Sequence, residues 1–324
     1  MTPTHSRGAS MTVSRRTALQ ILGAGLFAGS QAGRIRAAAP NARISFAFSL
    51  YGMKSLPLAQ ALKVCADIGY SGVELACMKD WPCDAAVLAP ADRRKLRRQL
   101  DECALELPGL MENLGLAVSE PQHAANLERL KFIGELAHDL AAPGEPTPVV
   151  ETVLGGKPDQ WDSVKGKMVD ALGDWERIAR QTETVIAVKA HVSGALHRPD
   201  DAVWLVRQIG SRWIKLVYDY SHFERQGLAL KATLTQMLPE TVFVHIKDNV
   251  TVAGKTEFAL PGDGGVDYRE YLQLLRDGGY GGAVCVEVSS QVSSKPGYNP
   301  IIAAEQCYLK LHPAFERAGL RARV

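Results

Sequence analysis

Four side chains suited to metal or proton chemistry stand at or near the ends of β-rich runs. The runs are "VVETV", "VYDYSHF", "FVHIKD" and "VCVEVS", and the side chains are Glu151, Asp219, His245 and Glu287. Three crowded carboxylates in a half-buried site need a nearby cation to stay ionised. Such a mostly oxygen set with one imidazole suits one divalent ion, with Mn²⁺ preferred and Co²⁺, Mg²⁺ or Zn²⁺ as alternatives. The other interpretation is a salt-bridge network without a metal, in which Lys189 and Lys247 supply the positive charge.

The elements that must position these residues follow from hydrophobic periodicity. Short β-rich runs alternate with helical patterns, several of which end in Gly. Eight such units predict a single (β/α)8 barrel. An open doubly wound sheet would need a Gly-rich phosphate loop after the first strand, and "SLYGMKS" is not one. The expected strands are 43–50, 72–77, 109–116, 148–153, 184–192, 213–220, 241–248 and 282–289.

The spacing of the four side chains agrees with this barrel. A βα unit takes about 30 residues, so the steps between them correspond to two, one and one units. The last unit is enlarged by residues 249–265, which we expect to form a loop or hairpin over the barrel mouth. All four therefore fall near the C-terminal ends of the strands, where barrel enzymes carry their chemistry.

Alternation along the strands predicts which side chains face the lumen. In "TVFVHIKD" the apolar Val244 and Ile246 share one face, and His245 and Lys247 the other. In a barrel the apolar face must meet the helices, so the polar face points inward. The expected lumen set is Glu74, Glu151, Lys189, His191, Asp219, His222, His245 and Glu287, with Lys247 beside them.

The N-terminus predicts an export signal in residues 1–39. Arg15 and Arg16 precede the apolar stretch "ALQILGAGLFAG" and the small-residue run "RAAAP", the arrangement of a twin-arginine signal. Residues 40–324 would then be the mature barrel, exported to the periplasm or an equivalent compartment. A disordered basic tail is the alternative.

Composition limits the partners. The chain is 46% hydrophobic and 22% charged with a net charge of +2, which does not favour nucleic-acid binding. No second apolar run is long enough to span a membrane, so we expect no stable membrane insertion after signal cleavage. The six cysteines show no metal-site spacing. Pairing of Cys77 with Cys83 and formation of a homo-oligomer stay open.

The same motifs, together with "LPGDGGVDY", resemble the xylose-isomerase-like barrel superfamily over essentially the whole mature chain. The superfamily includes sugar isomerases, keto-sugar epimerases, inosose dehydratases and endonuclease-IV-type enzymes. The resemblance implies that Glu151, Asp219, His245 and Glu287 bind one metal and that His222 touches substrate. The chain departs from the epimerase branch at "LGGKPD" and at "TEFAL", where a second Glu and an Arg often stand in that branch.

A metal bound to two substrate oxygens would acidify the C–H beside a carbonyl, so that a carboxylate can remove the proton. Glu151 and Glu287 are the candidate acid–base pair, as in the resembled epimerases. Lys189 and His191 are candidate oxyanion donors or an alternative base, while Lys247 and Glu74 join His222 as candidate substrate-binding residues. The expected activity is isomerisation or epimerisation of a neutral sugar or keto-sugar through an enediolate. Loss of a leaving group would instead give a lyase or dehydratase acting on a keto-glycoside or inosose.

Two other classes fit less well. A repair endonuclease would need extra His ligands on the second and third strands, which offer Glu74 and Glu112. A non-catalytic carbohydrate-binding barrel would not need three carboxylates and a lysine in its lumen. The sequence therefore favours an enzyme with a small carbohydrate substrate.

Overall fold

Eight parallel strands close into one barrel, as predicted. The computed structural model describes residue 1 and residues 44–116 and 119–318. The strand order around the barrel is β1-β10-β7-β6-β5-β4-β3-β2. The strands are β1 (Ser45–Ser49), β2 (Gly72–Ala76), β3 (Glu106–Met111), β4 (Val149–Val153), β5 (Ile186–Lys189), β6 (Ile214–Asp219), β7 (Thr241–Ile246) and β10 (Ala283–Val286).

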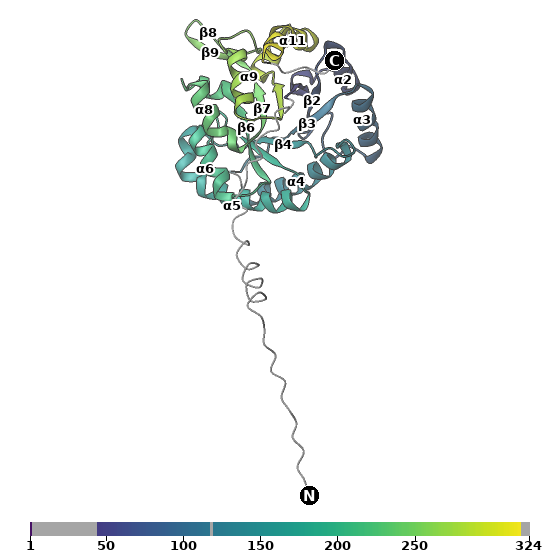
Figure 1. Cartoon of the computed structure of the whole chain (residues 1–324), viewed down its shortest axis with the longest axis vertical. Coiled ribbons are helices and arrows are strands. Elements are labelled where there is room, and N and C mark those ends of the chain that lie inside the picture. Colours follow the sequence, from purple (N-terminus) through teal and green to yellow (C-terminus); the bar gives the residue numbers. More distant parts are fainter. Residues whose placement is uncertain (2–43, 117–118, 319–324) are drawn as a thin grey trace. The chain divides into compact units, whose positions relative to one another are not determined.

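Helices form the outer layer around this barrel (Figure 1). Gly69 and Gly210 end two of them in the left-handed conformation, with φ of 111° and 62°, as a glycine C-cap does. No helix in the described ranges is long and apolar enough to cross a membrane. The main helices are α2 (Leu58–Ile68), α3 (Pro90–Glu102), α4 (Glu120–Leu140), α5 (Trp161–Gln181), α6 (Pro199–Ile209), α8 (Leu230–Met237), α9 (Tyr268–Asp277) and α11 (Pro300–Arg317), and the short ones η1 (Leu50–Met53), η2 (Pro158–Gln160), α7 (Tyr220–Glu224), η3 (Leu238–Glu240) and α10 (Ser290–Ser293).

The alternation of buried residues along the strands is as predicted. Val244 and Ile246 of β7 belong to the large core that also contains buried helical residues. Phe243 belongs to a separate core cluster with Ala187 and Cys285, which come from other strands of the barrel. Since successive side chains of a strand point to opposite faces, His245 shares the inner face with Phe243.

The third strand differs from the prediction, because it runs from Glu106 to Met111 instead of starting at residue 109. Pro108 lies inside it, and proline weighs against a strand assignment since it cannot donate to the ladder. The structure accommodates the proline through a shift in the β2–β3 register between Gly72 and Glu74. Pairing on either side of the irregularity keeps β3 in the barrel.

The enlarged last unit forms a hairpin, as predicted. Strands β8 (Asp248–Val252) and β9 (Lys255–Ala259) pair antiparallel. The Asp248 carboxylate fixes the loop after the hairpin: Oδ2 accepts from the backbone N–H groups of Gly262 and Gly264 at 2.9 and 2.7 Å, and Oδ1 accepts from the Tyr268 hydroxyl at 2.6 Å. The "PGDGG" motif is therefore held against the end of β7.

The predicted export signal falls outside the described residues, so both it and the boundary at residue 40 stay predictions.

Candidate functional site

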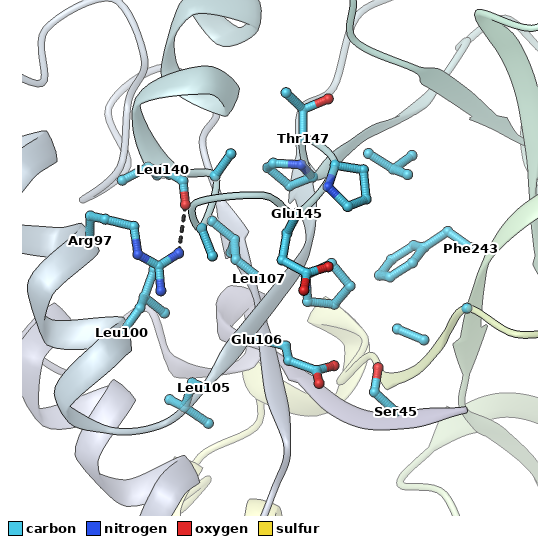
Figure 2. A pocket seen from close by; sticks show the side chains of 18 of the residues that line it. Ser45, Arg97, Leu100, Leu105, Glu106, Leu107, Leu140, Glu145, Thr147 and Phe243 are labelled. Atoms are coloured by element: carbon cyan, nitrogen blue, oxygen red, sulfur yellow. Dashed lines mark hydrogen bonds between the residues drawn. The ribbon is translucent and has the colours of Figure 1, made fainter. Parts of the chain in front are cut away.

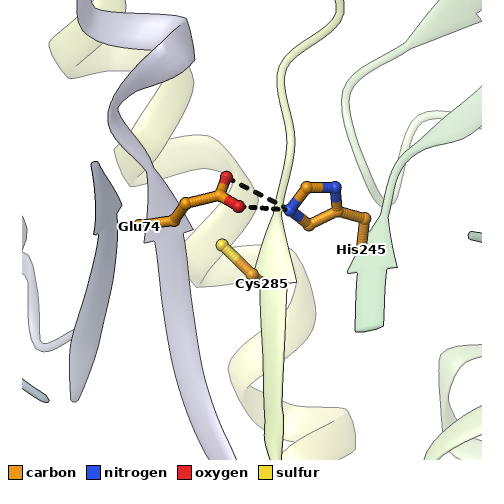
Figure 3. Close-up of side chains that lie close together, drawn as sticks. All are labelled: Glu74, His245 and Cys285. Atoms are coloured by element: carbon orange, nitrogen blue, oxygen red, sulfur yellow. Dashed lines mark hydrogen bonds and ion pairs between the residues drawn. The ribbon is translucent and has the colours of Figure 1, made fainter. Parts of the chain in front are cut away.

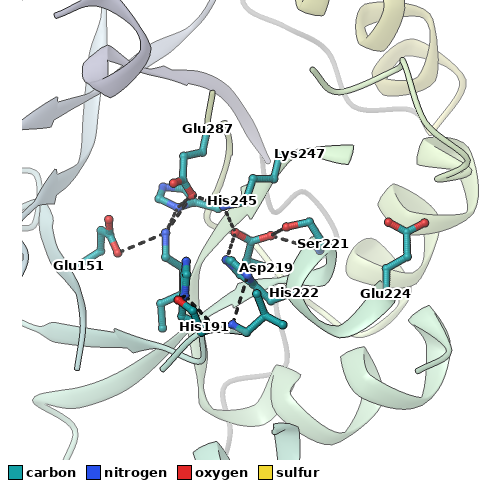
Figure 4. Close-up of polar contacts among 12 residues, drawn as sticks. Glu151, His191, Asp219, Ser221, His222, Glu224, His245, Lys247 and Glu287 are labelled. Carbon is teal, nitrogen blue, oxygen red and sulfur yellow. Dashed lines mark hydrogen bonds and ion pairs between the residues drawn. The ribbon is translucent and has the colours of Figure 1, made fainter. Parts of the chain in front are cut away.

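Seven buried charged or imidazole side chains meet at the C-terminal ends of the strands. We call them the lumen cluster, and they come from β2, β4, β5, β6, β7 and β10 or the residues just after them (Figure 4). None is more than 8% exposed. The cluster is Glu74, Glu151, Lys189, Asp219, His245, Lys247 and Glu287.

Lys189, the last residue of β5, lies at the centre of the contacts. Its Nζ donates to Glu287 Oε2 at 2.8 Å and lies 2.9 Å from His245 Nδ1 and 3.7 Å from Glu151 Oε2. Burial lowers the pKa of Lys189, but Glu151, Glu287 and Asp219 outweigh burial and hold it above its ordinary value. Lys189 is therefore a fixed ammonium group.

Lys247 supplies a second cation from the residue after β7. Its Nζ donates to Asp219 Oδ2 and Glu287 Oε2, both at 2.8 Å. The other oxygen of Asp219 accepts from the Ser221 hydroxyl at 2.6 Å and its backbone N–H at 3.2 Å. Burial raises the pKa of Asp219, but Lys247 and His222 reverse this and lower it well below its ordinary value. Asp219 is thus an ionised carboxylate whose two oxygens both have partners.

His245 bridges two carboxylates. Its Nε2 lies 3.1 Å from both oxygens of Glu74 (Figure 3), and its Nδ1 lies 3.0 Å from Glu287 Oε2. Burial lowers the pKa of His245, while Glu74 and Glu287 raise it, with a net result well above its ordinary value. Glu74 therefore orients the ring, and its contact with substrate stays a prediction.

Glu151 stands apart from the strongest pairs. Its Oε2 is buried without a hydrogen-bond partner. Burial raises the pKa of Glu151 to about 7, although Lys189 and His245 partly oppose the rise. A carboxyl group with a pKa near neutrality and a free oxygen is suited to accept a proton at physiological pH.

His191 and His222 form a neutral wall beside the cluster. Their ring centroids are 4.1 Å apart, and His222 Nε2 lies 3.4 Å from Asp219 Oδ2. Burial lowers the pKa of His191 to about 2 and that of His222 to about 4. His191 Nδ1 lies 2.8 Å from the Ser193 hydroxyl. Two neutral imidazoles suit hydrogen bonding to an uncharged polyol.

The hairpin covers this wall. The Phe258 ring packs edge-on against His222, with centroids 5.3 Å apart, and lies 5.1 Å from Lys247 Nζ. Arg225 lies 4.5 Å over the same ring. Sequence reasoning placed the hairpin at the mouth but did not single out Phe258. The sequence feature that could have identified Phe258 is its position as an aromatic residue among the polar residues of the insertion 249–265.

The donors for a divalent ion converge only in part. Ligand atoms of Asp219, His245 and Glu287 lie within 4.8 Å of one another, as do those of Glu74, His245 and Cys285. Glu151 belongs to neither group, and whether it is a ligand stays a prediction. The oxygen atoms of Asp219 and Glu287 that face Lys247, and the His245 nitrogen that faces Lys189, are already 2.8–2.9 Å from ammonium groups. With both lysines in these positions, the residues do not fit a bound divalent ion.

A cavity of about 540 Å³ lies at the opposite end of the barrel (Figure 2). Its lining includes Ser45, Glu106, Val149 and Ala283, which begin their strands or lie at their N-terminal ends. Arg97 in its wall is bonded to the Leu140 carbonyl and to Asp101. In such barrels the N-terminal end of the strands usually contributes to stability, and the active site lies at the C-terminal end. We therefore assign the chemistry to the lumen cluster and not to this cavity.

Cys77 and Cys83 are free thiols in the described structure. Burial raises the pKa of both, so neither is a ready nucleophile.

Comparison with known proteins agrees with the fold. The description "Xylose isomerase-like TIM barrel" matches residues 62–306. No curated protein sequence matches the chain. Among solved structures, the chain is similar to 3-keto-D-glucoside 4-epimerase from E. coli (15% identity, TM-score 0.63, 84% of this chain and 99% of that chain). It is also similar to the probable 3-DHS dehydratase from Bacillus anthracis (17%, 0.65, 82% and 98%).

A third similar structure is the IOLI protein with a binding zinc atom (19%, 0.68, 86% and 100%). The chain further matches 43% of a longer xylose isomerase-like TIM barrel/4-hydroxyphenylpyruvate dioxygenase fusion protein (18%, 0.69, 86% of this chain). At these identities the likeness to solved structures shows the fold alone. The match over residues 62–306 shows more, and the chain belongs to the xylose isomerase-like TIM barrel family.

Proposed function

We propose that this protein is an isomerase or epimerase that moves a proton on the carbon beside a carbonyl group of a small carbohydrate. The observation that carries the proposal is one ammonium group between two buried carboxylates. Lys189 Nζ lies 3.7 Å from Glu151 Oε2 and 2.8 Å from Glu287 Oε2. A similar structure, described as 3-keto-D-glucoside 4-epimerase, supports a carbohydrate substrate.

In the proposed reaction Glu151 is the base. It takes the proton from the substrate carbon, and the electron pair of that C–H bond forms an enediolate. The Lys189 ammonium stabilises the negative charge that develops on the carbonyl oxygen, as preorganised donors do. Return of the proton to the other face of the same carbon gives an epimer, and return to the neighbouring carbon gives an isomer. Glu287 is the other predicted member of the acid–base pair and lies 2.8 Å from Lys189 Nζ. Burial raises the pKa of Glu287, but Lys189, Lys247 and His245 outweigh burial and lower it well below its ordinary value. Glu287 is therefore ionised and returns a proton only after taking one up from solvent, while the proton on Glu151 exchanges with solvent.

The substrate class follows from the walls and from the proposed location. Neutral His191 and His222 favour hydroxyl groups over phosphate. We propose export by the twin-arginine route, which would also exclude phosphorylated cytoplasmic sugars. An unphosphorylated sugar, 3-keto-glycoside or inosose is therefore the expected substrate. If it carries a leaving group on the next carbon, the same enediolate would expel it, and the enzyme would be a lyase.

The sequence predicts a divalent ion, with Mn²⁺ preferred. To bind Asp219, His245 and Glu287, this ion would have to displace the side chains of Lys189 and Lys247 from them. When bound, such an ion polarises a carbonyl group. We assign no step to it, because Lys189 already faces the carboxylates that would flank the substrate.

The test is a screen of unphosphorylated sugars, 3-keto-glycosides and inososes in D₂O, followed by NMR. Deuterium on the carbon beside the carbonyl, lost in Glu151→Gln, is the expected result. Conversion without solvent label would contradict the proposed proton transfer. A new unsaturated product would identify the lyase branch.

A further inference from the structure

Two lysine side chains contact the predicted metal ligands of the lumen cluster. Lys189 enters from β5 and Lys247 from the residue after β7, and their side chains are 3% and 2% exposed. Both reach the same atom, Glu287 Oε2, at 2.8 Å. One carboxylate oxygen thus accepts from two ammonium groups, a position that a metal ion would otherwise take.

In the group formed by Asp219, His245 and Glu287, one ligand atom of each residue is already in contact with a lysine. Asp219 Oδ2 and Glu287 Oε2 accept from Lys247, and His245 Nδ1 is 2.9 Å from Lys189. The remaining His245 nitrogen faces Glu74. An ion bound to these atoms would stand close to two ammonium groups, whose like charge opposes its binding.

The balance of charge within the lumen cluster also argues against a bound divalent ion. Four carboxylates face Lys189, Lys247 and His245. Buried carboxylates are tolerated when cations pair with them. Lys189, Lys247 and His245 provide such pairing from the chain itself.

We propose that the ammonium groups of Lys189 and Lys247 replace the divalent ion as the positive charge of the site. In this arrangement Lys189 prevents a divalent ion from binding. The proposal rests on the same site as the proposed function, and its metal measurement is independent of any activity.

The experiment measures metal content and thermal stability. The purified wild-type protein is incubated with Zn²⁺ or Mn²⁺, passed through gel filtration and analysed by inductively coupled plasma mass spectrometry. We expect it to retain less than about 0.1 equivalent of either ion, with an unchanged Tm after EDTA treatment. Retention of about one equivalent that EDTA removes with a fall in Tm would overturn the proposal.

Lys189→Glu is the gain-of-binding variant. It removes the ammonium and adds a carboxylate near His245 and Glu287, and we expect it to retain about one equivalent of Zn²⁺ and to gain stability from it. Lys63→Glu makes the same charge change on the surface, where Lys63 pairs only with nearby Asp67 in the contacts described, and should bind no more ion than wild type. A folded Lys189→Glu protein that retains no Zn²⁺ would contradict the proposal. If that variant does not fold, Lys189→Gln is tested in its place: a rise in retained Zn²⁺ supports the proposal, and retention equal to wild type overturns it.

Discussion

Lys189 and Glu287 are 98 residues apart in the chain, and their charged atoms are 2.8 Å apart inside the barrel. The pair joins β5 to the residue after β10, and Lys189 Nζ also lies 2.9 Å from His245 Nδ1 and 3.7 Å from Glu151 Oε2. A cation from the protein thus stands among the residues that the sequence predicted as metal ligands, and the predictions below follow from this arrangement.

Glu151→Gln tests the proposed base. We expect a loss of about 10²–10⁴-fold in the rate of deuterium exchange, because the amide keeps the shape but cannot accept the proton. KM should change little, since Glu151 Oε2 has no hydrogen-bond partner to lose. Steady-state kinetics and NMR in D₂O measure both. Glu145→Gln, an exposed position at the far end of the barrel, is the matched control, and equal losses in the two variants would rule out this role.

Lys247→Met tests the second cation. It leaves Asp219 and Glu287 without one of their ammonium partners, and breaking a buried pair in this way lowers the free energy of unfolding by about 3–5 kcal/mol. The exposed pair of Lys63 with Asp67 provides a control, since Lys63→Met should leave the unfolding midpoint nearly unchanged. Urea denaturation of both proteins checks the difference. Similar midpoints for the two variants would show that the buried pair does not stabilise the fold.

Gly264→Ala tests the loop held by Asp248. A Cβ at Gly264 would lie 2.5 Å from the Asn249 carbonyl oxygen and 2.8 Å from Asp248 Cβ, whereas a Cβ at Gly265 would meet nothing within 4 Å. Overpacking of this kind typically costs about 1–3 kcal/mol. We expect a lower Tm for Gly264→Ala and an unchanged Tm for Gly265→Ala in differential scanning calorimetry. A loop that tolerates both alanines equally would refute the anchoring role.

Ionisation of Asp84 should account for part of the stability that the protein loses in acid. Burial raises the pKa of Asp84, but hydrogen bonds from the backbone of Ala86 and Asp80 and from Arg129 outweigh burial and hold it below 3.8. Because the folded-state pKa is lower than the unfolded one, the ionised carboxylate stabilises the fold above pH ~4. This contribution is lost as the pH falls through the folded-state pKa.

The variant Asp84→Asn removes this titration. Its free energy of unfolding should be lower than that of wild type near pH 7 and should fall less steeply between pH ~5 and ~2. Asp67→Asn, on the surface, should follow the wild-type slope. Parallel pH profiles for wild type and Asp84→Asn would contradict the prediction.

The sequence by itself determined the barrel and the inner faces of its strands. Period-2 alternation of residues such as Phe243 and His245 is a local property, and the length of one βα unit fixes how many strands separate Glu151 from Asp219. Because parallel strands place their C-terminal ends on one side, the meeting of acidic and imidazole side chains could be predicted as well. The bounds of β3 could not, since its bulge depends on the neighbouring strand.

Only the tertiary structure showed that two lysines reach the predicted metal ligands. The sequence left a divalent ion and a lysine network open, because both satisfy the same charge requirement. Closure of the barrel sets the distance across the lumen, and that distance lets Lys189 reach Glu287 while Lys247 reaches both Asp219 and Glu287. A long side chain on one strand can be paired with a partner on a distant strand only when the positions of both are known.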